Sequence, residues 1–270
     1  MYTRCGYEHR FIDEIDLSAN MIRIIAVVSI IAVSILLLMS LGCSSLERKL
    51  MFHPSHQPAD GGLTAWMKDG QVIGFCRKVE SPQNVWLMLH GNGGQASGRG
   101  YAIPCFSTND SVYILEYPGY GFRKGMPSRL SFNTAASEAY MTLRSIYGAV
   151  PVCVVGESIG TGPASCLATV SPPPDKVVLI VPYEKLSEVA KDRFPGILVR
   201  MILKNDWNNI DALSRYKGPV EIFGAKFDDV IPVGHAKALA AGIPSSKFVL
   251  IDCGHNEWSD DGHVKIRYEH

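Results

Sequence analysis

The sequence predicts an α/β fold built on a mostly parallel sheet with helices on both faces. Short apolar runs alternate with segments of helical periodicity over most of the chain after residue 84. This alternation is typical of strand–helix–strand units, whose helices cover the sheet. In addition, the pentapeptide Gly156-Glu-Ser-Ile-Gly160 lies between an apolar run and a helical segment of small residues. That placement indicates a sharp strand-to-helix corner.

The first expected element is a hairpin of residues 63–67 and 72–78, which turns at Lys68-Asp-Gly70. The run 85–89 is continuously apolar and suits the centre of a parallel sheet. Further strands are expected at 112–117, 152–155, 176–181, 220–223 and 248–251. Helices are expected from after residue 94 to about Phe106, over 131–147 and over 233–241.

Residues 182–218 lie between two of the expected strands, at a place where a large cap could be inserted. This insert has room for one or two short helices, around 186–191 and 197–203. We therefore expect a minimal cap and a shallow, open pocket.

The composition indicates one globular domain with a terminal extension. The chain has 270 residues, of which 47% are hydrophobic and 19% are charged. Its 26 basic and 26 acidic residues balance, so no nucleic-acid partner is expected. The seven cysteines are scattered, without a C-x-x-C pair or a Cys/His cluster, so no metal site is expected.

An apolar segment near the N-terminus predicts attachment to a membrane. Residues 24–41 are almost entirely apolar, Arg23 precedes them, and Cys43 with two serines follows. A buried core helix is a minor alternative. Two interpretations are favoured: a lipoprotein signal in which Cys43 is the lipidated residue, or an uncleaved single-pass anchor. Both make the lipid bilayer a partner. Both also predict a membrane-associated protein whose folded domain lies outside the cytoplasm.

These observations divide the chain into three parts. Residues 1–42 are predicted to be an N-terminal tail and hydrophobic signal or anchor segment, residues 43–60 a tether, and residues 61–270 the folded domain. The first 20 residues are polar and somewhat acidic, which is unusual ahead of an export signal. They are interpreted as an upstream mis-start or a disordered tail, with Met21 as the more natural start.

Ser158, at the centre of the pentapeptide, is the predicted nucleophile. A serine on such a corner has unusual backbone angles, and its neighbours two residues away on either side need to be small. Gly156 and Gly160 meet this need, because they let the strand and helix backbones approach closely.

A serine hydroxyl needs a base, and the base needs an acid to orient it. In this architecture the order along the chain is serine, acid, histidine. Asp228 follows the strand 220–223 and fits the D-x-x-[IV]-P frame, so it is preferred to its neighbour Asp229 as the acid. His255 follows the strand 248–251 and is the predicted base. His235 is instead expected on an exposed helix.

The tetrahedral intermediate of such a reaction needs two N–H donors for its oxyanion. The backbone N–H of Ile159, directly after the nucleophile, is predicted to be one of them. The other is expected from the loop His90-Gly-Asn-Gly-Gly94, with Asn92 as the first choice and Gly93 as the second. The glycines of this loop could also cradle a phosphate, but no Lys-Ser/Thr pair follows them, which excludes a P-loop.

Taken together, these segments resemble the α/β-hydrolase superfamily, and within it a small, lid-poor branch of serine-aminopeptidase-like and depalmitoylase-like proteins. The segments that carry the resemblance are Lys49-Leu-Met-Phe-His-Pro54, His90 to Gly94, Glu116-Tyr-Pro-Gly-Tyr-Gly121, Gly156 to Ala164, Asp228 to Pro232 and Gly254-His255-Asn256. They cover nearly all of residues 46–256 in the family order. Arg123 departs from the family pattern, in which a small polar residue is common.

The resulting prediction is a membrane-tethered serine hydrolase that acts through an acyl-enzyme on a small acyl-bearing ester, thioester or amide, without metal or cofactor. A peptidase activity falls within this class. Two alternatives remain open: a non-catalytic, membrane-tethered binding protein that retains the fold, and an acyltransferase that uses the same triad. The sequence leaves the acyl group and the oligomeric state undetermined.

Overall fold

The computed structural model describes residues 29–30, 45–58 and 62–269. Residues 48–270 form one compact unit, and the fold below is that unit. The apolar segment 24–41 falls almost wholly outside the described residues, as does Cys43. Within the part of the chain that the structure describes, no helix is both long and apolar enough to cross a membrane.

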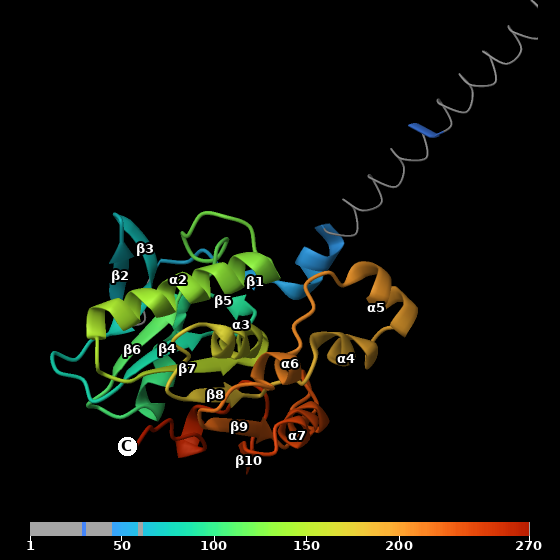
Figure 1. Ribbon diagram of the computed structural model, residues 1–270. Helices are drawn as coiled ribbons and strands as arrows, with labels where there is room; N and C mark the ends of the chain where they lie inside the picture. The colour runs from blue at the N-terminus through green and yellow to red at the C-terminus, as the bar shows by residue number, and fades with distance from the viewer. Residues whose placement is uncertain (1–28, 31–44, 59–61, 270) are drawn as a thin grey trace, which may run out of the picture. The chain divides into compact units, whose positions relative to one another are not determined.

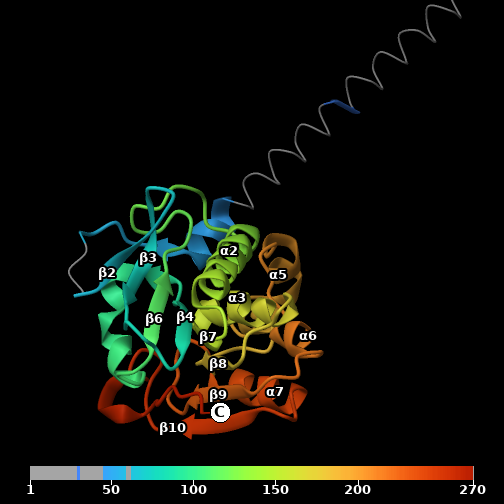
Figure 2. The same ribbon diagram turned by 60° about the vertical axis from the view of Figure 1, so that its left-hand side comes forward.

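The unit is organised around an eight-stranded, mostly parallel sheet, as predicted (Figures 1 and 2). Its spatial order is β10 (Lys247–Ile251), β9 (Val220–Ala225), β8 (Val177–Ile180), β7 (Val152–Glu157), β4 (Val85–Leu89), β6 (Ser111–Leu115), β3 (Gln71–Arg77) and β2 (Thr64–Lys68). The pairs from β10 to β6 are parallel, and β3 and β2 join antiparallel. The strands β4, β6, β7 and β8 are buried along their whole length, which explains why their sequences are mostly apolar.

The predicted hairpin of β2 and β3 forms at the expected turn. Asp69 and Gly70 have φ angles of 50° and 75°. The tight turn of a two-residue hairpin requires positive φ angles at both of its central residues. Asp-Gly is a favoured pair at these positions.

Helices cover both faces of the sheet. The main ones are α2 (Arg129–Tyr147), α3 (Thr161–Cys166), α7 (Val233–Gly242) and the 3₁₀ helix η1 (Ala96–Cys105). Alternate side chains of β4 point to opposite faces. Leu87 packs in the apolar cluster that includes α2 and α3, whereas Trp86 packs in a second cluster with η1 and the C-terminal segment. Figures 1 and 2 show α2 and α3 lying over the central strands.

The insert after β8 is a minimal cap, as predicted, but it holds one more helix than expected. Its helices are α4 (Leu186–Lys191), α5 (Gly196–Ile202) and α6 (Asn209–Leu213). The sequence analysis missed α6, which is five residues long. Short elements complete the fold: β1 (His53–Pro54) pairs in parallel with β5 (Gly93–Gly94), and η2 (Ser158–Gly160), η3 (Leu167–Thr169) and η4 (Asp260–Gly262) are single 3₁₀ turns.

Two expectations about individual residues were wrong. α2 begins at Arg129 and not at residue 131, because the Ser128 hydroxyl accepts a hydrogen bond from the Ser131 N–H at 3.0 Å and caps the helix. His235 is buried, not exposed, because carboxylates of the insert pack around it.

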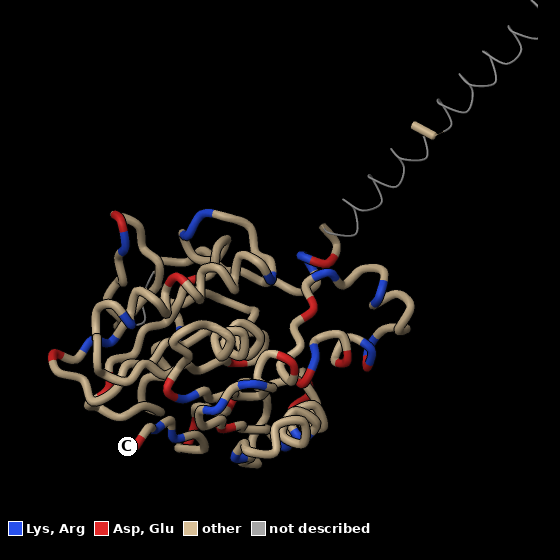
Figure 3. Tube along the Cα trace, in the orientation of Figure 1, with Lys and Arg blue, Asp and Glu red and all other residues tan. Residues whose placement is uncertain are grey.

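Charges of both signs are interspersed over the described part of the chain (Figure 3). This distribution follows the even balance of basic and acidic residues in the sequence.

Candidate active site

The corner between β7 and α3 places Ser158 in a left-handed backbone conformation, with a φ angle of 53°. That conformation is uncommon for a residue with a β-carbon, and such residues concentrate at functional sites. The Thr161 hydroxyl donates a hydrogen bond of 2.7 Å to the Ser158 carbonyl and holds the turn. The structure therefore presents Ser158 on a sharp elbow, as the pentapeptide predicts.

The two glycines of the pentapeptide are sterically required. A β-carbon on Gly160 would lie 2.1 Å from the carbonyl oxygen of Leu89, and one on Gly156 would lie 2.6 Å from the carbonyl oxygen of Gly160. Each of these neighbours is backbone, which cannot move aside as the end of a side chain can. A larger residue at position 160 would push the elbow away from β4, and one at position 156 would push β7 away from the start of α3.

The structure brings Ser158, His255 and Asp228 together. His255 Nε2 lies 3.0 Å from the Ser158 hydroxyl oxygen, and His255 Nδ1 lies 2.7 Å from Asp228 Oδ2. Their exposed fractions are 6%, 8% and 9% in the order Ser158, His255, Asp228. These residues come from the ends of three strands, and they form one continuous hydrogen-bonded chain.

Asp228, and not Asp229, faces the histidine. Asp228 Oδ1 accepts hydrogen bonds from the N–H groups of Val230 at 2.9 Å and Ile231 at 2.7 Å, which leaves Oδ2 for His255. Asp229 is exposed, and its carbonyl oxygen accepts a 2.8 Å hydrogen bond from Arg193 Nη2. The loop after β9 thus fixes the orientation of the Asp228 carboxylate through its own backbone.

The loop after β4 lies against the elbow. A β-carbon on Gly91 would be 3.7 Å from the β-carbon of Ser158. Two tyrosine hydroxyls hold the carbonyl groups of the loop: Tyr117 donates to His90 O at 3.0 Å, and Tyr120 donates to Asn92 O at 2.7 Å. The loop is therefore fixed close to the predicted nucleophile.

The peptide between Gly91 and Asn92 has a defined orientation. His90 is fully buried, and burial lowers its pKa, so its imidazole is neutral at pH 7. Because a carbonyl oxygen only accepts, His90 Nδ1 donates the 2.8 Å hydrogen bond to Gly91 O. In a trans peptide the N–H of Asn92 points opposite to that carbonyl.

The two other predicted oxyanion donors have different surroundings. Ile159 is the second residue of η2, and N–H groups in the first turn of a helix have no intrahelical partner. Gly93 lies in β5 beside β1, and its carbonyl accepts a hydrogen bond from Arg99 Nη2. The Asn92 side chain is directed elsewhere, since its amide donates to Met51 O at 3.1 Å.

Sequence reasoning missed the side chains that support this loop. Arg123, which departs from the family pattern, is half-buried, and its Nη1 donates a 2.6 Å hydrogen bond to Glu116 O. The Glu116 carboxylate in turn accepts from the Ala96 N–H at 3.1 Å. Glu116 lies in a segment that carries the family resemblance, but only the packing shows that its carboxylate holds the start of η1 and that its carbonyl is held by Arg123.

No group of three or more histidine, cysteine, aspartate or glutamate residues that could hold a metal ion occurs in the described parts of the chain. The described cysteines Cys76, Cys105, Cys153, Cys166 and Cys253 are free thiols. Burial raises the pKa of both Cys105 and Cys253 to about 11, so these thiols stay protonated near neutral pH.

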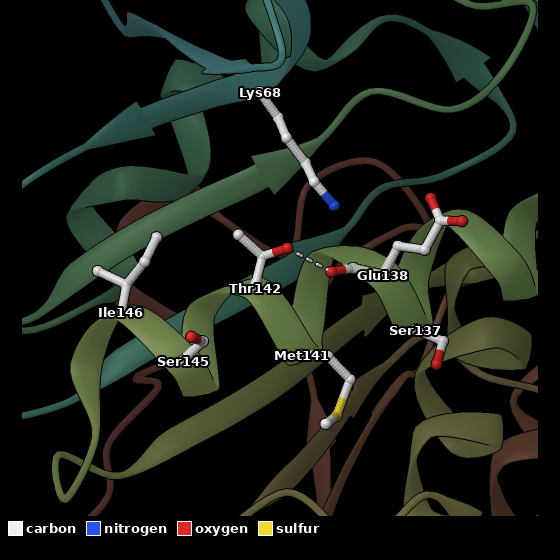
Figure 4. A pocket seen from close by; sticks show the side chains of 7 residues that line it. All are labelled: Lys68, Ser137, Glu138, Met141, Thr142, Ser145 and Ile146. Carbon is white, nitrogen blue, oxygen red and sulfur yellow. Dashed lines mark hydrogen bonds between the residues drawn. The ribbon is translucent and has the colours of Figure 1, made fainter.

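A surface hollow of about 500 Å³ lies away from the site, between β2 and the exposed side of α2 (Figure 4). It is lined by Lys68, Ser137, Glu138, Met141, Thr142, Ser145 and Ile146. Within it the Thr142 hydroxyl donates to the Glu138 carbonyl at 2.7 Å, a bond along the helix. The hollow shares no residue with the site around Ser158.

This sheet, with a serine elbow after β7, an acid after β9 and a histidine after β10, is the α/β-hydrolase fold. Solved structures share it. An esterase of Pyrococcus furiosus superposes with a TM-score of 0.57 at 12% identity, covering 78% of this chain and 92% of that one. The ferulic-acid complex of Est1E from Butyrivibrio proteoclasticus gives 0.57 at 16% identity, covering 72% and 90%.

No protein-family model matches the chain. An uncharacterized protein of Mycobacterium tuberculosis is 26% identical over 251 residues, which cover 87% of this chain and 88% of that protein. Lysophosphatidylserine lipase ABHD12 of Danio rerio is 28% identical over 203 residues, 67% of this chain and 52% of the lipase. Human alpha/beta hydrolase domain-containing protein 17B is 28% identical over 194 residues, 68% of this chain and 64% of that protein. The chain has the α/β-hydrolase fold and is similar in sequence to these proteins over two thirds or more of its length, which supports classing it as a hydrolase.

Proposed function

We propose that the protein is a serine hydrolase that cleaves an ester, thioester or amide through an acyl-enzyme. The observation that carries this proposal is the hydrogen-bonded chain from Ser158 through His255 to Asp228. The three groups are buried and within hydrogen-bonding distance of one another, which is the geometry that activates a serine hydroxyl.

In the proposed reaction the Ser158 oxygen attacks the acyl carbon while His255 Nε2 takes the hydroxyl proton. Asp228 keeps the remaining ring proton on Nδ1 and stabilises the imidazolium that forms. The N–H groups of Ile159 and Asn92 hold the oxyanion. Collapse of the intermediate expels the alcohol, thiol or amine, which receives the proton from His255. Water then attacks the acyl-enzyme by the same steps in reverse and releases the acid.

A lipid-like acyl substrate is the class we favour. One relative is named as a lysophosphatidylserine lipase. The cap helix α5 also exposes apolar side chains, with Ile197 75% and Met201 62% exposed. A small cap with an apolar surface suits an acyl chain better than a charged substrate.

We further propose that the N-terminal segment tethers the protein to a membrane, through lipid on Cys43 or through an uncleaved anchor. The support is the apolar run at residues 24–41 and the cysteine that follows it. A full-length Cys43→Ser variant separates the two routes. Loss of lipid labelling and of membrane association supports the lipoprotein, whereas unchanged membrane association without lipid labelling of the wild type supports the anchor.

The test of the hydrolase proposal is labelling of the full-length protein with a fluorophosphonate, followed by turnover of activated esters and thioesters of increasing chain length. We expect labelling and turnover in the wild type and neither in Ser158→Ala. Ser165→Ala is the matched control, because Ser165 is also a buried serine, seven residues further along in α3. Equal labelling of wild type and Ser158→Ala would exclude Ser158 as the nucleophile.

A further inference from the structure

A cluster of polar side chains beside Ser158 takes no part in the mechanism above. Glu157, the residue before the predicted nucleophile, is 5% exposed. Its carboxylate accepts hydrogen bonds from the Tyr101 hydroxyl at 3.1 Å and from Trp258 Nε1 at 3.4 Å. Arg99 Nη1 lies 3.8 Å from Glu157 Oε2 and donates to the Tyr101 hydroxyl at 2.8 Å. We call Glu157 and Arg99 the clamp pair.

The clamp pair forms hydrogen bonds with the loop after β4 on both sides of Asn92. Glu157 Oε2 accepts a 3.1 Å hydrogen bond from the Gly91 N–H. Arg99 Nη2 donates to the Gly93 carbonyl oxygen. The residues before and after Asn92 are therefore tied to one ion pair, and Glu157 belongs to the elbow that carries Ser158.

We propose that Glu157 and Arg99 are positioning residues that together set the Asn92 N–H against the reacting carbonyl oxygen. This inference rests on the proposed function, because it assigns a role in the same reaction. A donor contributes to an oxyanion site only when it is held in place before the charge develops. The clamp pair supplies that restraint from the elbow itself, so the nucleophile and the donor keep their relative position.

The charge of the pair matters as well as its hydrogen bonds. Glu157 alone would be a buried negative charge next to the place where a second negative charge forms. Arg99 balances it from 3.8 Å. Burial opposes the charge of Arg99, but the neighbouring Glu157 and Tyr101 more than offset that effect and raise the pKa of Arg99. The guanidinium therefore stays charged at any pH at which the protein is assayed.

This reasoning gives an unusual order of activities. Arg99→Met removes the hydrogen bond to the Gly93 carbonyl oxygen and leaves Glu157 without its counter-charge. We therefore expect kcat to fall by about 10²-fold, which is comparable to the loss of an oxyanion donor. Glu157→Gln keeps an oxygen for the Gly91 N–H and should fall less, about tenfold. The double variant removes the unbalanced charge, so its kcat should exceed that of Arg99→Met alone. Two losses that do not add are the mark of a coupled pair.

The experiment measures kcat, KM and thermal unfolding of the full-length variants with one activated ester. Arg144→Met is the matched control, because Arg144 also pairs with a carboxylate, Asp175 at 2.8 Å, and with the Tyr140 hydroxyl, away from the site. We expect the clamp variants to lose kcat with little change in KM, and Arg144→Met to lose stability with kcat unchanged. Arg99→Lys, which keeps the charge without the planar fork, should recover part of the loss.

Affinity for a tetrahedral boronate inhibitor gives a second readout, since it should weaken in Arg99→Met in parallel with kcat. The proposal is overturned if Arg99→Met matches Arg144→Met in kcat, or if the double variant is slower by the product of the single losses. Either result leaves Ser158 labelling intact. Failure of the proposed function itself would instead appear as turnover by Ser158→Ala.

Discussion

Replacing Asp228 by asparagine tests the site most sharply, because the surrounding backbone determines how the new amide must lie. Asp228 Oδ1 accepts from the N–H groups of Val230 and Ile231 at 2.9 and 2.7 Å. An asparagine that turned its NH₂ toward these donors would lose both hydrogen bonds, about 1 kcal/mol each, and leave like groups facing one another. The amide oxygen therefore stays with the two N–H groups, and the NH₂ faces His255.

That orientation of the amide changes the tautomer of His255. The NH₂ can only donate, so His255 Nδ1 must accept, and its proton moves to Nε2. Nε2 lies 3.0 Å from the Ser158 hydroxyl and can no longer take its proton. The corresponding change in a serine protease lowers kcat by about 10⁴, which is roughly 5.5 kcal/mol in the barrier. We expect a loss of about that size here, with little change in stability because the two backbone hydrogen bonds remain.

The assay is kcat on an activated ester, with thermal unfolding measured in parallel. Asp229→Asn is the control, since Asp229 is exposed and its contact with Arg193 is made by its carbonyl oxygen. It should change kcat by less than about threefold, an effect typical of a surface charge. Retention of kcat within tenfold in Asp228→Asn, or an equal loss in Asp229→Asn, would refute this reasoning.

Two further predictions concern stability. Gly160→Ala should lower the free energy of unfolding by about 3 kcal/mol, because its β-carbon meets the Leu89 carbonyl oxygen at 2.1 Å; denaturant unfolding measures this, and a change below about 1 kcal/mol would contradict it. Burial opposes the charge of His235, but Asp192 and Glu184 at 2.8 and 2.9 Å more than offset it and raise its pKa. A raised pKa stabilises the fold fully below the unfolded value, about 6.5, and this stabilisation is lost as pH rises through the folded pKa. His235→Gln should therefore lower Tm more at pH 5.5 than at pH 9, and the reverse order would show that the ion pairs do not act as inferred.

The centre of the sheet could be predicted from sequence because burial on both faces leaves a continuous apolar run. Residues 85–89 were predicted as a strand and form β4 without a shift at either end. The start of α2 was placed two residues late, since Ser131 was taken as the beginning of the helix. In the structure Ser131 completes the cap that Ser128 provides, with serine where glutamate or glutamine is usual.

Long-range packing explains what could not be predicted. Trp258, Val264 and Ile266 are fully buried against η1 and the adjoining strands, yet they lie in a segment with hardly any regular structure. Without periodicity, such a segment gives no signal of burial. His235 is a similar case, because the carboxylates that surround it come from the insert, more than 40 residues earlier in the chain.

The residues of the site also fall into two groups, those that the sequence could predict and those that depend on long-range packing. Ser158, Asp228 and His255 could be proposed from sequence because each follows a strand, and the carboxyl ends of parallel strands meet at one edge of a sheet. Topology alone therefore brings them close. Glu157 and Arg99 were not proposed, since the residue before the serine is variable in the G-x-S-x-G pattern and the direction of the Arg99 side chain depends on how η1 packs. If the clamp pair positions Asn92, part of the specificity of this site for its transition state depends on residues whose identity no motif specifies.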